Sequence, residues 1–331
     1  MTTNDGVVTV CIPAFQAATF IDRTLCCARD QTHEALRIVV SIDCSDEGTE
    51  GICRAHARDD DRVEVHPHTE RLGWVGNVNF LLDSVRSEFA FIYFHDDVIE
   101  PSYSERLVGA LRQTPDAASA HCDVLLYGDD HDRLRRGCTY DGSPAERLLT
   151  YLLSPNRGAL LRSLVRTASP ASRIRMPVAG ALYEMALVAA GVAVRVAEPL
   201  YRRWERRTGG LTDGWARRPF EEVVEGCRIN AVMAQALIED MHPSATERAL
   251  LDFGLAVYMT NRLRSLETRH AGSWLVDLED VVGGAPMILQ LPSAVNELPE
   301  HLREVCTSAL ETARARTAAR ARQVGGTATT A

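Results

Sequence analysis

The sequence predicts an α/β protein with a mostly parallel sheet flanked by helices and a C-terminal helical extension. Apolar, β-rich runs alternate with amphipathic helical patterns over residues 7–127, which is the order that right-handed βαβ crossovers require. From residue 220 onward the pattern is mainly helical and amphipathic. A chain of 331 residues is long enough for one large α/β domain and a smaller appended unit.

The first hundred residues predict four strands separated by three helices. The expected strands are 7–12, 36–42, 62–66 and 89–94, and the expected helices are 20–28, 50–58 and 73–86. The strands are short, rich in Val and Ile, and bounded by Pro, Asp or Gly. The helices place apolar residues on one face.

The later segments follow a less regular order. We expect helices at 101–112, 146–166 (interrupted by Pro155) and 181–190, with Gly191 as a C-cap, and strands at 120–127 and 192–196. Residues 220–311 form the helical extension, with a loop near Gly283-Gly284-Ala285-Pro286. The tail 312–331, rich in Ala, Arg, Thr and Gly, is expected to be disordered.

Composition narrows the classes of function. The net charge of −9 argues against nucleic-acid binding through a basic surface. All 36 basic residues are Arg, so Schiff-base and P-loop lysine chemistry are excluded. The nine Cys form no C-x-x-C pair, and we find no secretory signal and no apolar run of transmembrane length. The expected location is cytoplasmic, with free thiols.

Polar or turn-forming residues follow three of the predicted strands: Pro13-Ala14-Phe15, Asp43, and His95-Asp96-Asp97. Ligands of parallel α/β sheets bind outside the carboxyl ends of the strands, so these groups predict a binding site at one sheet edge. Two simpler interpretations stay open. Asp43 can form an Asx-turn or cap, and Asp97 can cap the helix that follows Pro101.

Several of these landmarks together resemble family-2 glycosyltransferases, which have the GT-A fold. They are Ile12-Pro13-Ala14-Phe15, Gln31-Thr32, the run from Ile42 to Thr49, Arg71-Leu72-Gly73 with Asn79, His95-Asp96-Asp97 with Pro101, and the stretch from Gly191 to Arg203. The resemblance covers residues 7–212 and is most specific in the first hundred.

The resemblance implies a Rossmann-like GT-A domain whose nucleotide-sugar-binding half is 1–127 and whose acceptor-side half is 128–219. It also implies inverting transfer of a sugar from a nucleoside diphosphate to a hydroxyl or amine of a small-molecule, natural-product or glycan acceptor. The donor-binding residues would be Pro13, Ala14, Phe15, Asp43, Arg71, Asn79, Asp96, Arg202 and Arg203.

The implied metal motif departs from the family pattern. Phe94 occupies the position of the first Asp, which leaves Asp96 and Asp97 as ligands of Mn²⁺ or Mg²⁺. His95 is a candidate third ligand, because imidazole suits Mn²⁺ better than Mg²⁺. As a lone histidine at a strand end, it can equally be a polar filler.

The general base and the late loop depart as well. The acid that the family places before Gly191 is missing, so Glu184, with Asp97, is the catalytic candidate, and Asp129 or Asp130 is an alternative base. Glu184 can equally be an ordinary helical glutamate. Trp204 stands where many members carry a histidine. Arg202, Arg203, Arg206 and Arg207 around it either bind phosphate or form a solvated loop.

These departures leave a second class of function open. A GT-A-fold protein that has lost glycosyl transfer would act as a nucleotide-binding or partner-binding module, or carry non-glycosyl chemistry. The helical extension is compatible with either function and offers a surface for a homodimer.

Overall fold

The computed structural model describes residues 6–45, 48–128, 132–154, 160–177, 180–205 and 220–267. The chain divides into two compact units, residues 1–147 with 156–217 and residues 148–155 with 218–331. Some sequence predictions fall outside the described residues: Asp129, Asp130, Arg206, Arg207, the loop at 283–286 and the tail 312–331.

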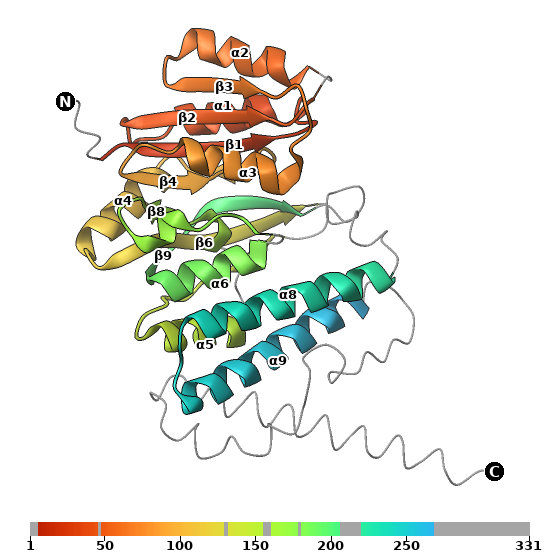
Figure 1. Cartoon of the computed structure of the whole chain (residues 1–331). Coiled ribbons are helices and arrows are strands. Elements are labelled where there is room, and N and C mark those ends of the chain that lie inside the picture. Colours follow the sequence, from red (N-terminus) through yellow and green to blue (C-terminus); the bar gives the residue numbers. More distant parts are fainter. Residues whose placement is uncertain are drawn as a thin grey trace. The chain divides into compact units, whose positions relative to one another are not determined.

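The first unit is built on one sheet with helices on both faces (Figure 1), which confirms the predicted α/β class. The strand order among the described residues is β3-β2-β1-β4-β8-β6-β9-β5, with β7 paired to β6. The strands are β1 (Val8–Ala14), β2 (Leu36–Ile42), β3 (Val63–Pro67), β4 (Phe89–Ile92), β5 (Val98–Ile99), β6 (Ala117–Gly128), β7 (Arg133–Arg135), β8 (Leu164–Arg166) and β9 (Val192–Glu205).

Strands β1 to β4 are all parallel, as the alternating pattern predicts. Val10 pairs with Ile38 of β2 on one side and with Phe91 of β4 on the other. Ala14 pairs with Ile42, so the carboxyl ends of β1 and β2 are level. The polar groups that follow these strands therefore meet at one edge.

Helices α1 (Ile21–Arg29), α2 (Thr49–Asp59), α3 (Gly73–Ser84), α4 (Tyr103–Gln113) and α6 (Gly180–Ala190) cover the sheet (Figure 1). Alternating strand residues divide between the faces. Ile12 and Ile38 belong to the core that contains Leu25 of α1 and Leu107 of α4. Cys11 packs on the other face against Leu81 of α3.

The predicted helix at 146–166 is wrong in its second half. Helix α5 (Pro144–Leu153) ends before Pro155, and a short 3₁₀ turn, η1 (Leu160–Arg162), leads into strand β8. β8 is antiparallel to both β4 and β6 and joins the two halves of the sheet. Strand pairing with two partners outweighs the weak local helical pattern.

β9 is longer than the predicted 192–196 and continues to Glu205. Its pairing with β6 shifts register between Cys122 and Val124, and this irregularity accommodates Pro199 within the strand. Gly191 does not have the left-handed backbone of the predicted C-cap. It is required instead by close packing, since a Cβ there would collide with the Cβ of Ala118.

The second unit contains the helical hairpin of α8 (Phe220–Asp240) and α9 (Ala245–Glu267). Ser244 and Glu247 form a reciprocal capping box at the start of α9, with Ser244 N–H donating to Glu247 at 2.8 Å. The rings of Tyr151 and Tyr258 lie 6.2 Å apart inside this unit. The predicted homodimer through this segment stays a prediction.

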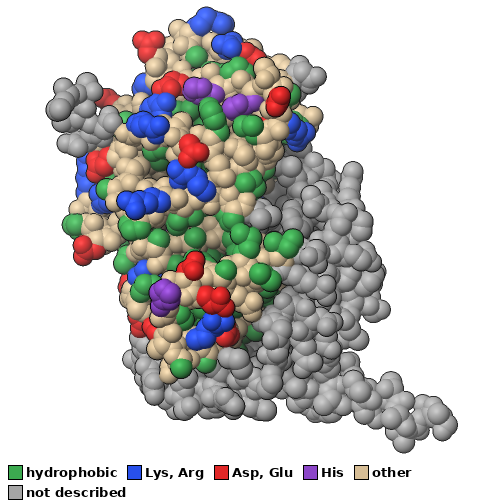
Figure 2. All heavy atoms as spheres, in the orientation of Figure 1, with side chains coloured by type: hydrophobic (Ala, Val, Ile, Leu, Met, Phe, Trp, Pro, Cys, Tyr) green, Lys and Arg blue, Asp and Glu red, His purple; other side chains and the backbone are tan. Residues whose placement is uncertain are grey.

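The described helices include none with the length and hydropathy needed to span a bilayer. Arginine and acidic side chains are interspersed on the face of the first unit shown in Figure 2. The described cysteines are all free thiols.

Candidate active site

Asp43 lies directly after β2 and is only 2% exposed. Its backbone N–H donates to the carbonyl of Ala14 at 2.9 Å, which fixes the residue beside the end of β1. Its carboxylate accepts a hydrogen bond from the backbone N–H of Leu72 at 2.5 Å. Asp43 thus connects the ends of two strands to the start of α3.

Arg71 and Phe15 form a stacked pair next to Asp43. The guanidinium carbon of Arg71 lies 3.7 Å from the centre of the Phe15 ring, and its Nε lies 3.9 Å from Asp43 Oδ2. The Arg71 side chain is 60% exposed. A planar cation on an aromatic ring, beside a buried carboxylate, is suited to stacking a base while the carboxylate accepts its N–H.

Two asparagines on α3 have different surroundings. Asn79, which the resemblance implies in donor binding, is occupied elsewhere: its amide donates to the carbonyl of Met176 at 3.0 Å and accepts from Met176 N–H at 2.7 Å. Asn77 is buried under the strand ends, donates to Ser41 O at 3.2 Å, and its Oδ1 has no partner among the described residues. Asn77 was not among the residues predicted from the sequence. Its polar side chain on an otherwise apolar face of the helix is the sequence feature that could have indicated it.

His95 and Asp96 lie at the same edge, after β4. His95 Nδ1 is 3.0 Å from the carbonyl of Pro13, so Nδ1 is the donor and Nε2 is the ring nitrogen that could bind a metal. The backbone is held by Thr24, whose hydroxyl donates to His95 O at 2.6 Å. Asp96 is half-buried, and its carboxylate makes no hydrogen bond to any residue that the structure describes.

One contact of His95 is typical of a metal ligand. A metal-binding histidine usually donates its second ring N–H to a carbonyl, as His95 does to Pro13. No third His, Cys, Asp or Glu among the described residues completes a cluster with His95 and Asp96, since the group with suitable spacing is Asp22, Cys26 and His56. Phosphate oxygens and water would have to supply the remaining ligands.

The structure places the Asp97 carboxylate in a buried network of hydrogen bonds, and its role as a metal ligand and catalytic residue stays a prediction. Asp97 is 2% exposed, and its Oδ2 accepts from Arg162 Nη2 at 3.0 Å and from the Tyr201 hydroxyl at 2.7 Å. Its Oδ1 accepts the backbone N–H of Trp204 at 3.3 Å. Both oxygens are therefore engaged by the protein.

Burial raises the pKa of the Asp97 carboxyl, while the charge of Arg162 opposes this. Burial by itself would lower the pKa of Arg162, but Asp97 and Tyr201 raise it above its ordinary range. Phe94, at the position of the missing first Asp, places its ring 4.8 Å from the Arg162 guanidinium carbon. The Phe94 ring therefore lies against the buried ion pair of Asp97 and Arg162.

Glu184 is 7% exposed on α6, and its carboxylate accepts the backbone N–H of Leu161 at 3.0 Å. It thereby anchors η1, and its role as general base stays a prediction. Arg202 forms an exposed ion pair with Glu100 at 2.8 Å. Arg203 is half-buried on β9 next to Trp204, and its charge acts on Asp97 to lower the pKa.

Trp204 packs edge-on against Tyr127, with ring centres 4.9 Å apart. Its indole Nε1 and the Tyr127 hydroxyl are buried. Strand β9 includes Arg202, Arg203 and Trp204. The strand therefore extends into the segment that the sequence predicts as a covering loop.

Residues 9–167 match the sequence model of glycosyl transferase family 2. The match covers just under half of the chain, so it is a similarity of this segment to that family. A Bacillus subtilis protein named as a glycosyltransferase, EpsH, is 26% identical over 181 residues, which cover 53% of this chain and 52% of that protein. An uncharacterised glycosyltransferase of Haemophilus influenzae is 26% identical over 110 residues, 33% of this chain and 34% of that protein.

Solved structures extend the likeness at the level of the fold. The S. aureus TarS fragment 1–349 in complex with UDP-GlcNAc has a TM-score of 0.61 at 19% identity, covering 89% of this chain and 82% of that one. The same fragment in complex with UDP has a TM-score of 0.59. The first unit thus has the GT-A fold. The chain spans about half and about a third of the lengths of the two curated relatives.

Proposed function

We propose that this protein is an inverting glycosyltransferase that moves a sugar from a nucleoside diphosphate to a hydroxyl or amine of a small-molecule, natural-product or glycan acceptor. The observation that supports it most is the meeting of Asp43, the Arg71–Phe15 stack and Asp96 with His95 at one edge of the segment that is similar to family 2. The edge offers separate places for a base and for a diphosphate.

Donor recognition begins at Asp43. Its carboxylate is held by the Leu72 N–H, and an ionised carboxylate has further acceptor capacity for an imino N–H or a ribose hydroxyl. Phe15 and Arg71 would stack on the base from the exposed side. Asp43 is fixed by the strand ends before the ligand arrives, so little ordering accompanies binding.

Mn²⁺ or Mg²⁺ would be held by Asp96 and by Nε2 of His95, and when bound it would stabilise the charge on the leaving diphosphate. His95 is oriented for this by its bond to Pro13 and by the hold of Thr24 on its backbone. Arg203 would add positive charge from β9. Attack by the acceptor from the face opposite the diphosphate would invert the anomeric centre.

Isothermal titration of UDP, GDP and dTDP, with and without Mn²⁺, tests this proposal. We expect one nucleotide to bind and Asp43→Asn to weaken its binding roughly 10-fold or more, because the remaining amide oxygen is engaged by the Leu72 N–H and the new NH2 cannot accept an N–H from the base. Asp116→Asn, at an exposed acid without a partner among the described residues, is the matched control. Absence of binding for all three nucleotides would reject the proposal.

The second candidate is a nucleotide-binding module without transfer. It is favoured by the buried ion pair of Asp97 with Arg162, which leaves Asp96 as the one acid of the His95-Asp96-Asp97 motif that is available to a metal. Donor hydrolysis separates the two candidates. A transferase hydrolyses its donor slowly without acceptor, and Asp96→Asn abolishes this. If wild type and variant bind nucleotide but are equally inactive with every donor, the module is the better description.

A further inference from the structure

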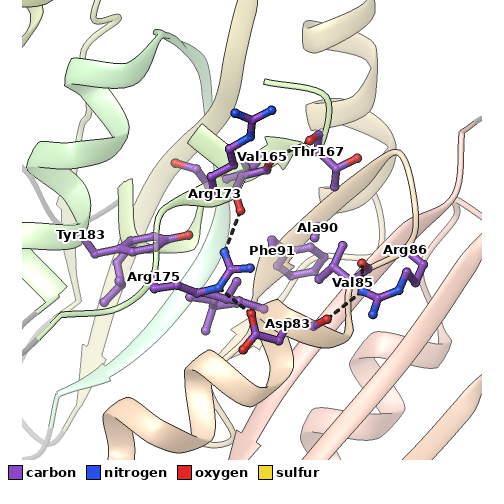
Figure 3. Close-up of a pocket in the computed structure, with 15 residues that line it drawn as sticks. Asp83, Val85, Arg86, Ala90, Phe91, Val165, Thr167, Arg173, Arg175 and Tyr183 are labelled. Carbon is purple, nitrogen blue, oxygen red and sulfur yellow. Dashed lines mark hydrogen bonds and ion pairs between the residues drawn. The ribbon is translucent and has the colours of Figure 1, made fainter. Parts of the chain in front are cut away.

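A pocket lies in the first unit, away from the sheet edge that carries Asp43. It is enclosed by the C-terminal end of α3, by β4 and β8, by the 3₁₀ turn η2 (Pro170–Arg173) and by α6 (Figure 3). Its volume is about 290 Å³. An apolar cavity of about 150 Å³ is enough for benzene, so there is space for a larger organic group.

The two sites are separated by the length of α3. The N-terminal end of this helix, at Leu72, binds Asp43, whereas Asp83 near its C-terminal end lines the pocket. The helix has 12 residues, which corresponds to roughly 18 Å at 1.5 Å per residue. A ligand in the pocket would therefore not occupy the donor edge.

The inner wall of the pocket is apolar. Ile92 of β4, Val165 of β8 and Tyr183 of α6 line it, and they are 2%, 7% and 4% exposed. All three belong to one hydrophobic cluster beneath α3 and α6, against which Leu82 packs. Tyr183 reaches into the pocket with its hydroxyl end foremost (Figure 3). This wall suits a hydrocarbon chain or an aromatic ring.

The outer rim is cationic. The lining includes Arg86, Arg173 and Arg175 and one acid, Asp83, so it carries three positive charges and one negative, a net +2 in a chain of net −9. Arg175 pairs with Asp83 at 2.7 Å. Arg173 makes no hydrogen bond or ion pair with the described part of the chain, so its five N–H donors are available.

One buried polar group also lacks a partner here. Ser163 lines the pocket and is 3% exposed, and its Oγ makes no hydrogen bond to a described residue. Buried hydroxyls are usually satisfied by protein, water or ligand. An unsatisfied hydroxyl in the wall of an otherwise apolar pocket points to a ligand with a polar atom inside it or to an enclosed water.

We propose that this pocket binds a small amphipathic anion, whose apolar body packs on Ile92, Val165 and Tyr183 and whose carboxylate or phosphate pairs with Arg173 and Arg175. Guanidinium groups bind either anion bidentately, so the shared feature is an anionic head on an apolar body. Neither the proposed sugar transfer nor the family match assigns this site.

Titration with octanoate, octyl phosphate and octanol tests the proposal by calorimetry, with the full chain as the sample. We expect saturable binding of at least one of the two anions, and roughly 5-fold or more weaker binding of octanol. Binding of octyl phosphate but not octanoate, or the reverse, would identify the head group. Octanol binding as tightly as both anions, or no saturable binding of either anion, would overturn the proposal.

Two variants locate the binding. Arg173→Ala removes an exposed guanidinium that supports nothing else in the described residues, and we expect it to weaken the bound anion roughly 5-fold. Arg58→Ala removes an equally exposed arginine on α2 and should leave binding unchanged. Equal affinity of Arg173→Ala and wild type would show that the anion does not bind at this rim. Competition by UDP would also contradict a site separate from the donor edge.

Discussion

The carboxylate of Asp97 and the guanidinium of Arg162 form a buried ion pair, with Oδ2 and Nη2 3.0 Å apart and side-chain exposures of 2% and 9%. Arg162 ends η1, and Tyr201 of β9 donates to the same oxygen. Asp97 thus joins three segments that are far apart in sequence. The second acid of the His95-Asp96-Asp97 motif supports the fold of the site, whereas the carboxylate of the first has no hydrogen-bond partner among the described residues.

Asp97→Asn is expected to destabilise the protein by about 3–5 kcal/mol, because it leaves the charge of Arg162 buried without its partner. Urea unfolding at neutral pH measures this. Asp96→Asn changes a half-buried residue whose carboxylate has no hydrogen-bond partner among the described residues, and it should alter the free energy of unfolding by less than about 0.5 kcal/mol. Similar small effects for both variants would argue against the ion pair as a stabilising contact.

His95→Asn is predicted to weaken Mn²⁺-dependent nucleotide binding roughly 10-fold while leaving metal-free binding unchanged. The asparagine amide can still donate to the Pro13 carbonyl, but it has no counterpart of Nε2. Titration of the nucleotide that binds, with Mn²⁺ and with Mg²⁺, is the measurement. The loss should be smaller with Mg²⁺, which prefers oxygen ligands. An equal loss without any metal would indicate that His95 only shapes the loop.

Arg71→Ala should weaken nucleotide binding roughly 5-fold to 10-fold with little effect on stability, because the side chain is 60% exposed and its main contact is the Phe15 ring. Arg71→Lys is the matched variant, since it keeps the charge but loses the planar group. If stacking matters, Lys should restore only part of the affinity. Full restoration by Lys would show that the charge near Asp43 suffices.

Sequence patterns predicted which residues share the candidate edge, because parallel topology leaves little choice. Once β1, β2 and β4 are parallel, the residues after them must share an edge, and Asp43, His95 and Asp96 do. The direction of Asp97 was not predictable in this way. It depends on Arg162 and Tyr201, which lie 65 and 104 residues away along the chain.

Strand β8 is a part of the fold that also depends on contacts distant in sequence. Leu164, Val165 and Arg166 continue a helical periodicity, and nothing local marks them as a strand. Their conformation is set by β4 and β6, which pair with them from both sides. The function of Gly191 likewise depends on a neighbour, Ala118, rather than on the helix that precedes it.

His121 on β6 is expected to make stability depend on pH. Burial lowers its pKa from 6.5 to about 4, and it packs against Gly137 and 5.9 Å from the Tyr140 ring centre. Between these two pKa values the unfolded chain binds the proton and the folded chain does not. The contribution of the buried, neutral His121 to the free energy of unfolding is therefore fully present above pH 6.5 and is lost as the pH falls toward 4.

The size of this effect is at most about 3 kcal/mol, from a shift of roughly two and a half pKa units. Urea unfolding at several pH values between 7 and 4, for wild type and His121→Gln, measures it. Glutamine does not titrate, so the free energy of unfolding of the variant should fall less steeply over this range, whatever its value at pH 7. Carboxylates such as Glu64, whose pKa is lowered by its hydrogen bond from Arg37, contribute equally to both proteins and cancel in the comparison. Parallel curves would mean that His121 is protonated in the folded protein, and hence that a nearby acid such as Asp123 compensates for its burial.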